Sequence, residues 1–210
     1  MKVRNLLLLL AFCCLSLAVQ AQFVSTSAYP KREFRAAWIQ AVNGQFRGIP
    51  TDRLKQILIN QLNSLQGAGI NAVIFQVRPE ADALYASQYE PWSRFLTGVQ
   101  GKAPEPYWDP MQFMIDEYSA LPSKPKIFLV YPVKVFKNNF GISDSLVQNG
   151  VIPLIRKVAR KNKLQTIDLY SAFENKGNLM ISDGIHPNRE GAKVMAEVIG
   201  KAITDSYSEH

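Results

Sequence analysis

The sequence predicts an α/β fold with about four mainly parallel strands and helices on both faces. Short apolar runs typical of buried strands alternate along the chain with longer stretches whose apolar residues recur at helical spacing. Glycines and prolines separate these stretches. With 210 residues the chain can bury one good core or two small ones. It is shorter than the roughly 250 residues of a complete eight-stranded β/α barrel.

A strand and a helix open the predicted fold. Residues 34–42, FRAAWIQAV, have the pattern of a short buried strand. Thr51 or Asp52 is expected to cap the helix that follows, and Gly67 and Gly69 end it. The apolar positions of this helix are Leu54, Ile57, Leu58, Leu62 and Leu65.

The next apolar run, residues 70–79, ends at Pro79 and suits a strand covered on both faces. With the strand and helix before it, this run forms a βαβ unit, which implies a parallel pair. Residues 80–108 are irregular and rich in aromatic residues, as in a functional loop. Asp109 and Pro110 are expected to begin a helix. The apolar residues of that helix are Met111, Met114, Ile115, Tyr118 and Leu121.

The rest of the chain repeats this order. Residues 122–133 contain the third strand, and residues 144–161 a helix that Pro153 kinks or begins. Residues 165–173, QTIDLYSAF, predict the fourth strand, and residues 189–204 the closing helix. The residues of the closing helix predicted to be buried are Ala192, Met195, Ala196 and Ile199. Because the carboxyl ends of parallel strands share one edge, a site is expected there.

Residues 1–21 predict a cleaved secretory signal. Lys2 and Arg4 precede a short apolar run that ends in small residues. Both cysteines of the chain, Cys13 and Cys14, lie in this segment. The mature protein is therefore expected to be secreted or periplasmic, without a stable membrane span, a disulfide or a cysteine ligand.

The chain is basic, with 24 Lys+Arg against 17 Asp+Glu. The excess is scattered apart from one cluster, which consists of Arg156, Lys157, Arg160, Lys161 and Lys163. We interpret this cluster as the solvated face of a helix and predict no nucleic-acid partner. Weak attraction to an anionic envelope polymer stays open.

The segment SDGIHPN, residues 182–188, has the residue types of a hydrolase site. Asp183 and His186 lie three residues apart on a turn just before the closing helix. In a Ser-His-Asp triad the carboxylate fixes the imidazole tautomer, so that the far nitrogen can take a proton from a hydroxyl. In the alternative, this pair binds a metal, but the chain does not supply the further ligands. No metal or cofactor is therefore predicted.

The serines of the chain offer no clear nucleophile. Ser143 and Ser145 flank Asp144, and capping of the next helix explains this arrangement better. Ser93 lies in the aromatic loop with no base near it in the sequence. A triad also needs donors for the oxyanion.

A glycosidase site in the first half is a further alternative. Glycoside hydrolysis needs two carboxylates roughly 5–10 Å apart. The acids near the expected strand edge are Glu80, Asp82, Glu90, Glu105 and Asp109. Trp92, Tyr107 and Trp108 are candidates for stacking on sugar rings, with loop packing as their alternative role. Arg78 is a candidate for binding a hydroxyl or carboxylate group of the substrate.

Four stretches of the first half resemble the glycosyl hydrolase-like family 10 of secreted bacterial proteins. They are KREFRAAWIQAV, NAVIFQVRPEADALY, YEPWSRFLTGVQGKAP and WDPMQFMIDE, within about residues 31–117. The resemblance implies a (β/α) barrel that acts on a glycan, with peptidoglycan as one candidate. Only about two β/α units are present, so no catalytic carboxylate is carried over from the family.

The second half, about residues 118–206, resembles the C-terminal part of SGNH (GDSL-type) hydrolases of the sialate O-acetylesterase kind. The stretches are ALPSKPKIFLVYPV, GISDSLVQNGVIPLIRKVA, TIDLYSAF and DGIHPNREGAKVMAEVI. The family implies a flavodoxin-like α/β fold that cleaves esters such as acetyl groups on sugars. Asp183 and His186 match the triad acid and base. The blocks that hold the family's serine nucleophile and oxyanion-hole asparagine have no counterpart here.

We interpret the chain as a composite of two truncated families. Residues 1–21 are the signal peptide, residues 22–117 a partial barrel segment, and residues 118–210 the end of an SGNH-like domain. Recombination within a shared helix and a misassembled gene explain such a joint equally. The predicted function is that of a hydrolase-derived secreted protein acting on carbohydrate, such as an acetylated sugar. The alternative is a non-catalytic glycan- or peptidoglycan-binding protein.

Overall fold

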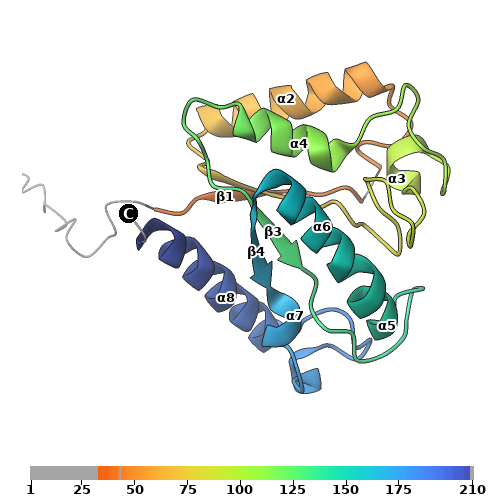
Figure 1. The fold of residues 1–210 in the computed structure, drawn as a ribbon, viewed down its shortest axis with the longest axis vertical. Helices are drawn as coiled ribbons and strands as arrows, with labels where there is room; N and C mark the ends of the chain where they lie inside the picture. The colour runs from red at the N-terminus through yellow and green to blue at the C-terminus, as the bar shows by residue number, and fades with distance from the viewer. Residues whose placement is uncertain (1–32, 43, 209–210) are drawn as a thin grey trace, which may run out of the picture. The chain divides into compact units, whose positions relative to one another are not determined.

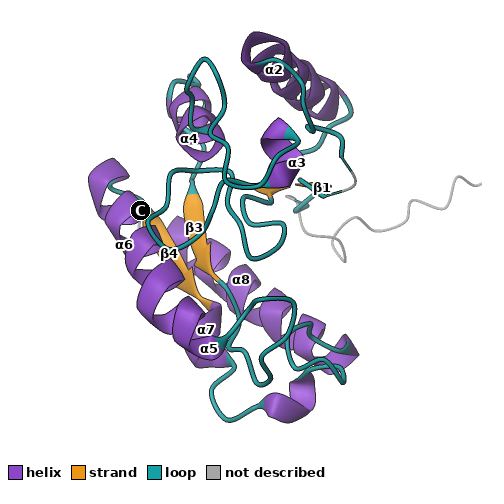
Figure 2. Cartoon of the chain, turned by 90° about the vertical axis from the view of Figure 1, so that its right-hand side faces the viewer, coloured by secondary structure: helices purple, strands orange, loops and turns teal. Residues whose placement is uncertain are grey.

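A computed structural model describes residues 33–42 and 44–208. The predicted signal peptide, residues 1–21, lies outside them. The described residues from Ala36 to Ser208 form one compact unit. Its four strands alternate with helices within the described residues, which confirms the predicted α/β class (Figures 1 and 2).

The first two strands form a parallel pair that is covered on one side only. Strand β1 (Ala36–Ile39) pairs with β2 (Ala72–Phe75), and α2 (Thr51–Gly67) connects them. Trp38 lies opposite Ile74 in the register, and their exposed fractions are 60% and 40%. The prediction that the second strand is covered on both faces is therefore wrong.

Helix α2 begins at Thr51 without a side-chain cap. Pro50 occupies the N-cap position, so the prediction that Thr51 or Asp52 caps the helix is wrong. The hydroxyl of Thr51 instead donates a hydrogen bond to the carbonyl of Pro106, at 3.1 Å. This bond ties the start of α2 to the end of the long aromatic segment.

The segment of residues 80–108 is ordered by its own hydrogen bonds. The amide of Ala83 donates to Pro91, at 3.0 Å, and the amide of Ser93 donates to Ala83, at 2.9 Å. One short helix, α3 (Arg94–Thr97), lies within the segment. The segment leads into α4 (Pro110–Ser119), which Asp109 caps as predicted. The prediction that Leu121 belongs to this helix is wrong, because Leu121 lies beyond Ser119 and is 42% exposed.

The third and fourth strands form a second parallel pair. Strand β3 (Phe128–Tyr131) pairs with β4 (Gln165–Asp168), and this ladder is separate from that of β1 and β2. The fourth strand is shorter than residues 165–173 because α7 (Leu169–Ala172) begins after Asp168. The carboxylate of Asp168 accepts hydrogen bonds from the amide and hydroxyl of Ser171, at 2.9 and 2.8 Å. It therefore caps α7 and ends the strand.

The helix predicted for residues 144–161 is interrupted just before Pro153. Helix α5 (Asp144–Leu146) passes into a π-helical turn, η2 (Val147–Val151), and then into α6 (Ile152–Asn162). Pro153 lies in the first turn of α6, where its missing N–H costs no hydrogen bond. The wider turn before it absorbs the break in the α-helical ladder.

The closing helix, α8 (Arg189–Ser208), follows a short 3₁₀ turn, η3 (Gly177–Leu179). The prediction that Ala192 and Ala196 are buried is wrong, because both are exposed. Met195 and Ile199 are half-buried, and Gly191 and Ser206 are the buried positions.

One hydrophobic cluster includes residues from both sides of position 118. Its buried members Ala83, Tyr85, Met111 and Ile115 precede position 118 in the sequence. The residues Leu129, Leu154, Val158 and Leu164, which follow position 118, pack against them. The side-chain amides of Gln112 and Asn162 add two reciprocal hydrogen bonds between α4 and α6, at 3.0 and 3.3 Å. The residues before and after the predicted joint therefore share a core.

Candidate active site

Asp183 and His186 form a hydrogen-bonded pair on the loop before α8. The imidazole Nδ1 lies 2.6 Å from Asp183 Oδ2. The other carboxylate oxygen accepts hydrogen bonds from the amides of Ile185 and His186, at 2.8 and 3.0 Å. The side chain of Asp183 is 15% exposed and that of His186 is 64% exposed. The carboxylate thus holds a ring whose far nitrogen is accessible to a substrate.

Gly184 allows the loop to pass close to the segment that follows β3. Its φ is +71°, and a Cβ there would lie 2.8 Å from the backbone nitrogen of Lys137. The carbonyl of Gly184 accepts a hydrogen bond from the amide of Phe136, at 2.8 Å. The ammonium group of Lys137 donates to the carbonyl of Ser182, at 2.9 Å. A side chain at residue 184 would push the two segments apart.

Asn188 and Gly191 join the loop to α8. The side-chain oxygen of Asn188 accepts from the amide of Gly191, at 3.0 Å, as an N-cap does. The amide of Asn188 donates to Leu179, at 2.8 Å, and an added Cβ on Gly191 would collide with the carbonyl of Leu179. The segment DGIHPNREG therefore combines the candidate dyad with the residues that fix its backbone.

The hydrogen bonds to Asp183 lower the pKa of its carboxyl group to about 2. The amide of His186 contributes most, followed by the ring of His186 and the amide of Ile185. The loop geometry thus keeps the carboxylate ionised far into the acid range.

The hydrogen bonds that Asp183 accepts should be lost only at an unusually low pH. A carboxyl group whose pKa is lowered on folding stabilises the fold above its ordinary pKa of 3.8 and loses that effect as the pH falls through about 2. We expect the amide resonances of Ile185 and His186 to titrate with a midpoint near 2. Asp183→Asn should abolish this transition but not global acid unfolding. A midpoint near the ordinary carboxyl value would show that the hydrogen bonds do not form.

The three candidate serines have structural roles. Ser143 caps α5 by accepting from the amide of Leu146, at 3.2 Å. Ser93 is fully buried and accepts from the amide of Phe95, at 3.1 Å. Ser145 accepts from the side chain of Asn149, at 3.2 Å.

Within the described residues no hydroxyl group hydrogen-bonds to the ring of His186. An aromatic side chain lies beside that ring instead. Phe140 is 64% exposed, and its ring centroid is 6.4 Å from that of His186 in an edge-to-face arrangement. The imidazole therefore lies beside one exposed apolar ring, that of Phe140.

A polar network at the end of β3 was not predicted. Lys134 Nζ donates to Asp144 Oδ2 and to the hydroxyl of Tyr170, both at 3.0 Å, and this hydroxyl donates to the same carboxylate oxygen at 2.9 Å. Partial burial alone would raise the pKa of Asp144, but hydrogen bonds from Lys134 and Tyr170 outweigh it and lower that pKa. The same bonds raise the pKa of Lys134. The network closes the loop of residues 135–143, which contacts the dyad loop. The placement of Lys134 at a strand end was the only sequence signal for it.

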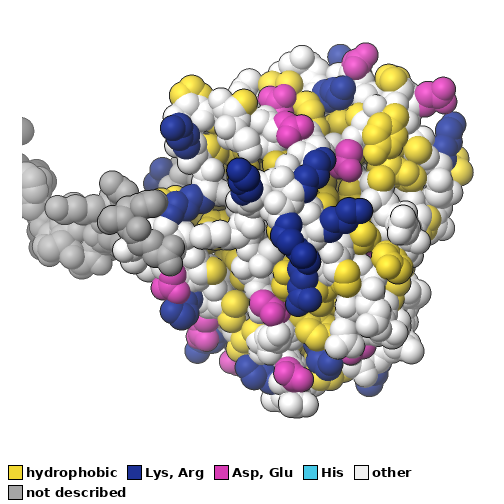
Figure 3. Space-filling model, in the orientation of Figure 1, with side chains coloured by type: hydrophobic (Ala, Val, Ile, Leu, Met, Phe, Trp, Pro, Cys, Tyr) yellow, Lys and Arg dark blue, Asp and Glu magenta, His cyan; other side chains and the backbone are white. Residues whose placement is uncertain are grey.

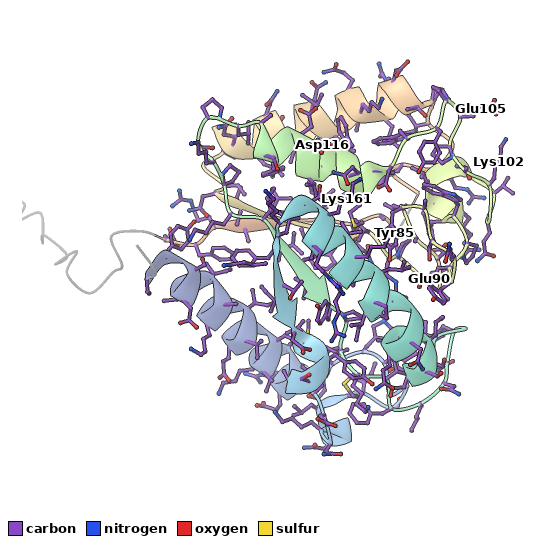
Figure 4. All side chains as sticks on the ribbon, viewed as in Figure 1. Tyr85, Glu90, Lys102, Glu105, Asp116 and Lys161 are labelled. Carbon is purple, nitrogen blue, oxygen red and sulfur yellow. The ribbon has the colours of Figure 1, made fainter. Side chains whose placement is uncertain are left out.

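Arg78, predicted to bind substrate, is occupied inside the protein. Its Nε lies 2.9 and 3.0 Å from the two carboxylate oxygens of Glu90, and a terminal nitrogen contacts the same group. The hydroxyl of Tyr85 donates to this carboxylate at 3.4 Å (Figure 4). Burial, followed by the charge of Glu90, raises the pKa of Tyr85. The side chain of Glu90 is fully buried and that of Arg78 is 15% exposed.

The predicted aromatic residues separate into a buried one and an accessible pair. Trp108 is 6% exposed and packs edge-to-face on Phe113, an arrangement that fits its alternative role of loop packing. Trp92 is half-buried, and its ring lies 6.0 Å from that of Tyr107, which is 64% exposed. Tyr107 therefore offers an accessible aromatic ring next to Trp92.

The acids of the first half are spread over different structural roles. Asp109 caps α4, and burial raises its pKa. Glu80 pairs with Arg94, at 2.9 Å, and Asp82 is fully buried with one carboxylate oxygen unbonded among the described residues. Glu105 is exposed (Figure 4).

The described residues contain no cluster of three or more histidine, cysteine or acidic side chains that could hold a metal ion. They also contain no helix with the length and apolar character needed to cross a membrane.

Comparison with known proteins relates the chain to carbohydrate-acting families. Residues 33–126 match the family Glycosyl hydrolase-like 10. Glycosyl hydrolase YngK of Bacillus subtilis is 46% identical over 95 residues, which are 43% of this chain and 18% of that protein. An acetylxylan esterase of Xylanibacter ruminicola is 44% identical over 85 residues, or 40% of this chain and 18% of that protein. The chain thus spans about a fifth of the length of these relatives.

Among solved structures, a GDSL-like lipase from Bacteroides thetaiotaomicron aligns with a TM-score of 0.45 and 17% identity. The alignment covers 76% of this chain and 73% of that chain. The family match runs past the predicted joint at residue 117 to residue 126. The predicted resemblance to two families, one glycosyl hydrolase-like and one esterase-like, is confirmed. The chain is related to carbohydrate hydrolases and esterases.

Proposed function

We propose that this chain derives from secreted ester hydrolases that act on acetylated carbohydrate. In this proposal His186 is the general base and Asp183 orients it. The observation behind the proposal is the 2.6 Å hydrogen bond between Nδ1 of His186, whose side chain is exposed, and Oδ2 of Asp183. A neutral imidazole held in this way presents Nε2 as the proton acceptor.

The relatives support the substrate class. One is named an acetylxylan esterase and another a glycosyl hydrolase. Both names concern enzymes that act on carbohydrate. Export through residues 1–21 is part of the proposal, as is the composite origin of residues 22–117 and 118–210.

The proposal includes the absence of a serine nucleophile from this chain. The candidate serines are engaged in capping or side-chain hydrogen bonds. A complete triad that loses its nucleophile loses several orders of magnitude in rate. An activated ester can still react slowly with imidazole or with water that the imidazole deprotonates.

Hydrolysis of p-nitrophenyl acetate and of acetylated xylan tests this function. We expect slow release of p-nitrophenol, roughly four to six orders of magnitude below a complete triad, and no release of acetate from xylan. His186→Ala should reduce p-nitrophenol release to the rate in buffer, and Asp183→Asn should reduce it in part. If His186→Ala has no effect, the dyad is not the active group. Rapid deacetylation of xylan would show that the chain contains a nucleophile.

Glycan binding without catalysis is the second candidate function. Trp92 and Tyr107 favour it, because their edge-to-face pair leaves Tyr107 largely exposed for stacking. Tyr107→Ala should then lower retention on an insoluble polysaccharide without changing the hydrolysis of p-nitrophenyl acetate. Tyr89→Ala, at another exposed tyrosine of the same segment, is the matched control.

A further inference from the structure

Two adjoining hollows lie beside α6 and the strands β3 and β4. The first has a volume of about 410 Å³ and extends from Tyr131 along Arg156 and Arg160. The second has a volume of about 390 Å³ and includes Lys124 and Lys126. Lys163 and Leu164 line both hollows and so connect them into one groove.

The walls of this groove are strongly basic. Its charged residues are Lys124, Lys126, Arg156, Arg160 and Lys163, and neither hollow is lined by an acid. Within the described residues none of these five side chains forms an ion pair. Figure 3 shows lysine and arginine side chains gathered across the middle of the face that it draws, around α6. The cations of the groove are therefore not neutralised by ion pairs among the described residues.

Two of these lysines have an unfavourable backbone conformation. The φ angles of Lys124 and Lys163 are +44° and +54°. The left-handed conformation is unfavourable for a residue with a side chain, and glycine is the usual residue where a helix ends in this way. A lysine at the C-cap of α6 therefore suggests a role for its side chain.

Aromatic rings fix two other cations of the groove. The guanidinium of Arg156 lies 5.5 Å from the ring centroid of Tyr131, and its Nε donates to the hydroxyl at 3.4 Å. The ammonium of Lys126 lies 4.4 Å from the ring centroid of Tyr207. Cations held in place lose less entropy when an anion binds.

We infer that this groove binds an anionic polysaccharide, through sugar units that bear carboxylate or phosphate groups. Thr166, Ser119 and Gln165 line it with neutral polar groups suited to sugar hydroxyls. Tyr131, the one aromatic side chain among its lining residues, is 5% exposed, so this ring is not available for stacking on a nucleic-acid base. The choice of a glycan rests on the proposed function, whereas the preference for an anion rests on the groove itself.

Binding of the full chain to three soluble polymers tests the inference. The probes are polygalacturonate, which bears carboxylates, a phosphomannan, which bears phosphates, and neutral dextran. We expect binding to at least one charged polymer, weakening as salt is added, and none to dextran. Arg160→Glu/Lys163→Glu should weaken it about 10-fold or more. Lys157→Glu/Lys193→Glu makes the same change of net charge at exposed lysines outside the groove and should weaken it less than about 3-fold.

Lys163→Gly separates binding from folding. Glycine relieves the left-handed strain, so the melting temperature should rise by about 1–4 °C while polymer binding weakens. If both double variants weaken polymer binding equally, net charge alone explains the effect, and the inference is overturned. So would tighter binding of a single-stranded oligonucleotide, or binding of neither charged polymer. Hydrolysis of p-nitrophenyl acetate in the same samples reports on the dyad separately, so a failure of each proposal can be told apart.

Discussion

Arg78→Ala should lower the free energy of unfolding by about 3–5 kcal/mol. The substitution removes the bidentate partner of Glu90, whose side chain is fully buried. The hydroxyl of Tyr85, at 3.4 Å, is then the only remaining side-chain donor to that carboxylate among the described residues. An unpaired buried charge costs far more than an intact pair contributes. Urea denaturation followed by tryptophan fluorescence measures the loss.

The double variant Arg78→Met/Glu90→Leu is the control for this result. It removes both charges and keeps most of the side-chain volume, so its stability should be within about 1–2 kcal/mol of the parent chain. If Arg78 served instead to bind a glycan from solvent, Arg78→Ala would unfold at nearly the parent urea concentration and lose binding only. That result would contradict the structural role of the pair.

The sequence predicts best where one residue determines the local backbone. Pro153 marks the start of α6 because proline has no N–H to donate. Asp109 caps α4 because its carboxylate accepts from an amide three residues on. In the segment DGIHPNREG, short spacing alone places Asp183 beside His186. All of these interactions lie within a few residues of one another.

Interactions between distant segments were not predictable in this way. Whether four strands form one sheet or two depends on pairing across long connections, and the chain forms two ladders. Glu90 is twelve residues from Arg78 on an irregular segment, so no periodicity indicated their pairing. For Trp108 the sequence left sugar stacking and loop packing open, and the structure places its ring in the core. A residue's position along the sequence does not determine its burial.

Ile115→Ala should destabilise the chain on both sides of the predicted joint. Ile115 is 5% exposed and belongs to the cluster that Leu129 and Leu154 also join. Removing a buried isoleucine side chain down to alanine costs about 2–5 kcal/mol, including the cavity that it leaves. Because the cluster spans residue 118, this loss should appear as one cooperative change rather than as melting of the first part alone.

Amide hydrogen exchange can test this directly. Exchange in β1–β2 and in β3–β4 should accelerate together, by about 30-fold or more for a loss of 2 kcal/mol. Leu121→Ala is the matched control, since this side chain is 42% exposed just beyond α4 and should change stability by less than about 0.5 kcal/mol. If β3–β4 kept its protection in Ile115→Ala, the two segments would fold independently and their shared cluster would be a weak contact. Joint acceleration would instead mean that sequences resembling two different families fold as one cooperative unit, because the apolar faces of α4 and α6 complete a single core.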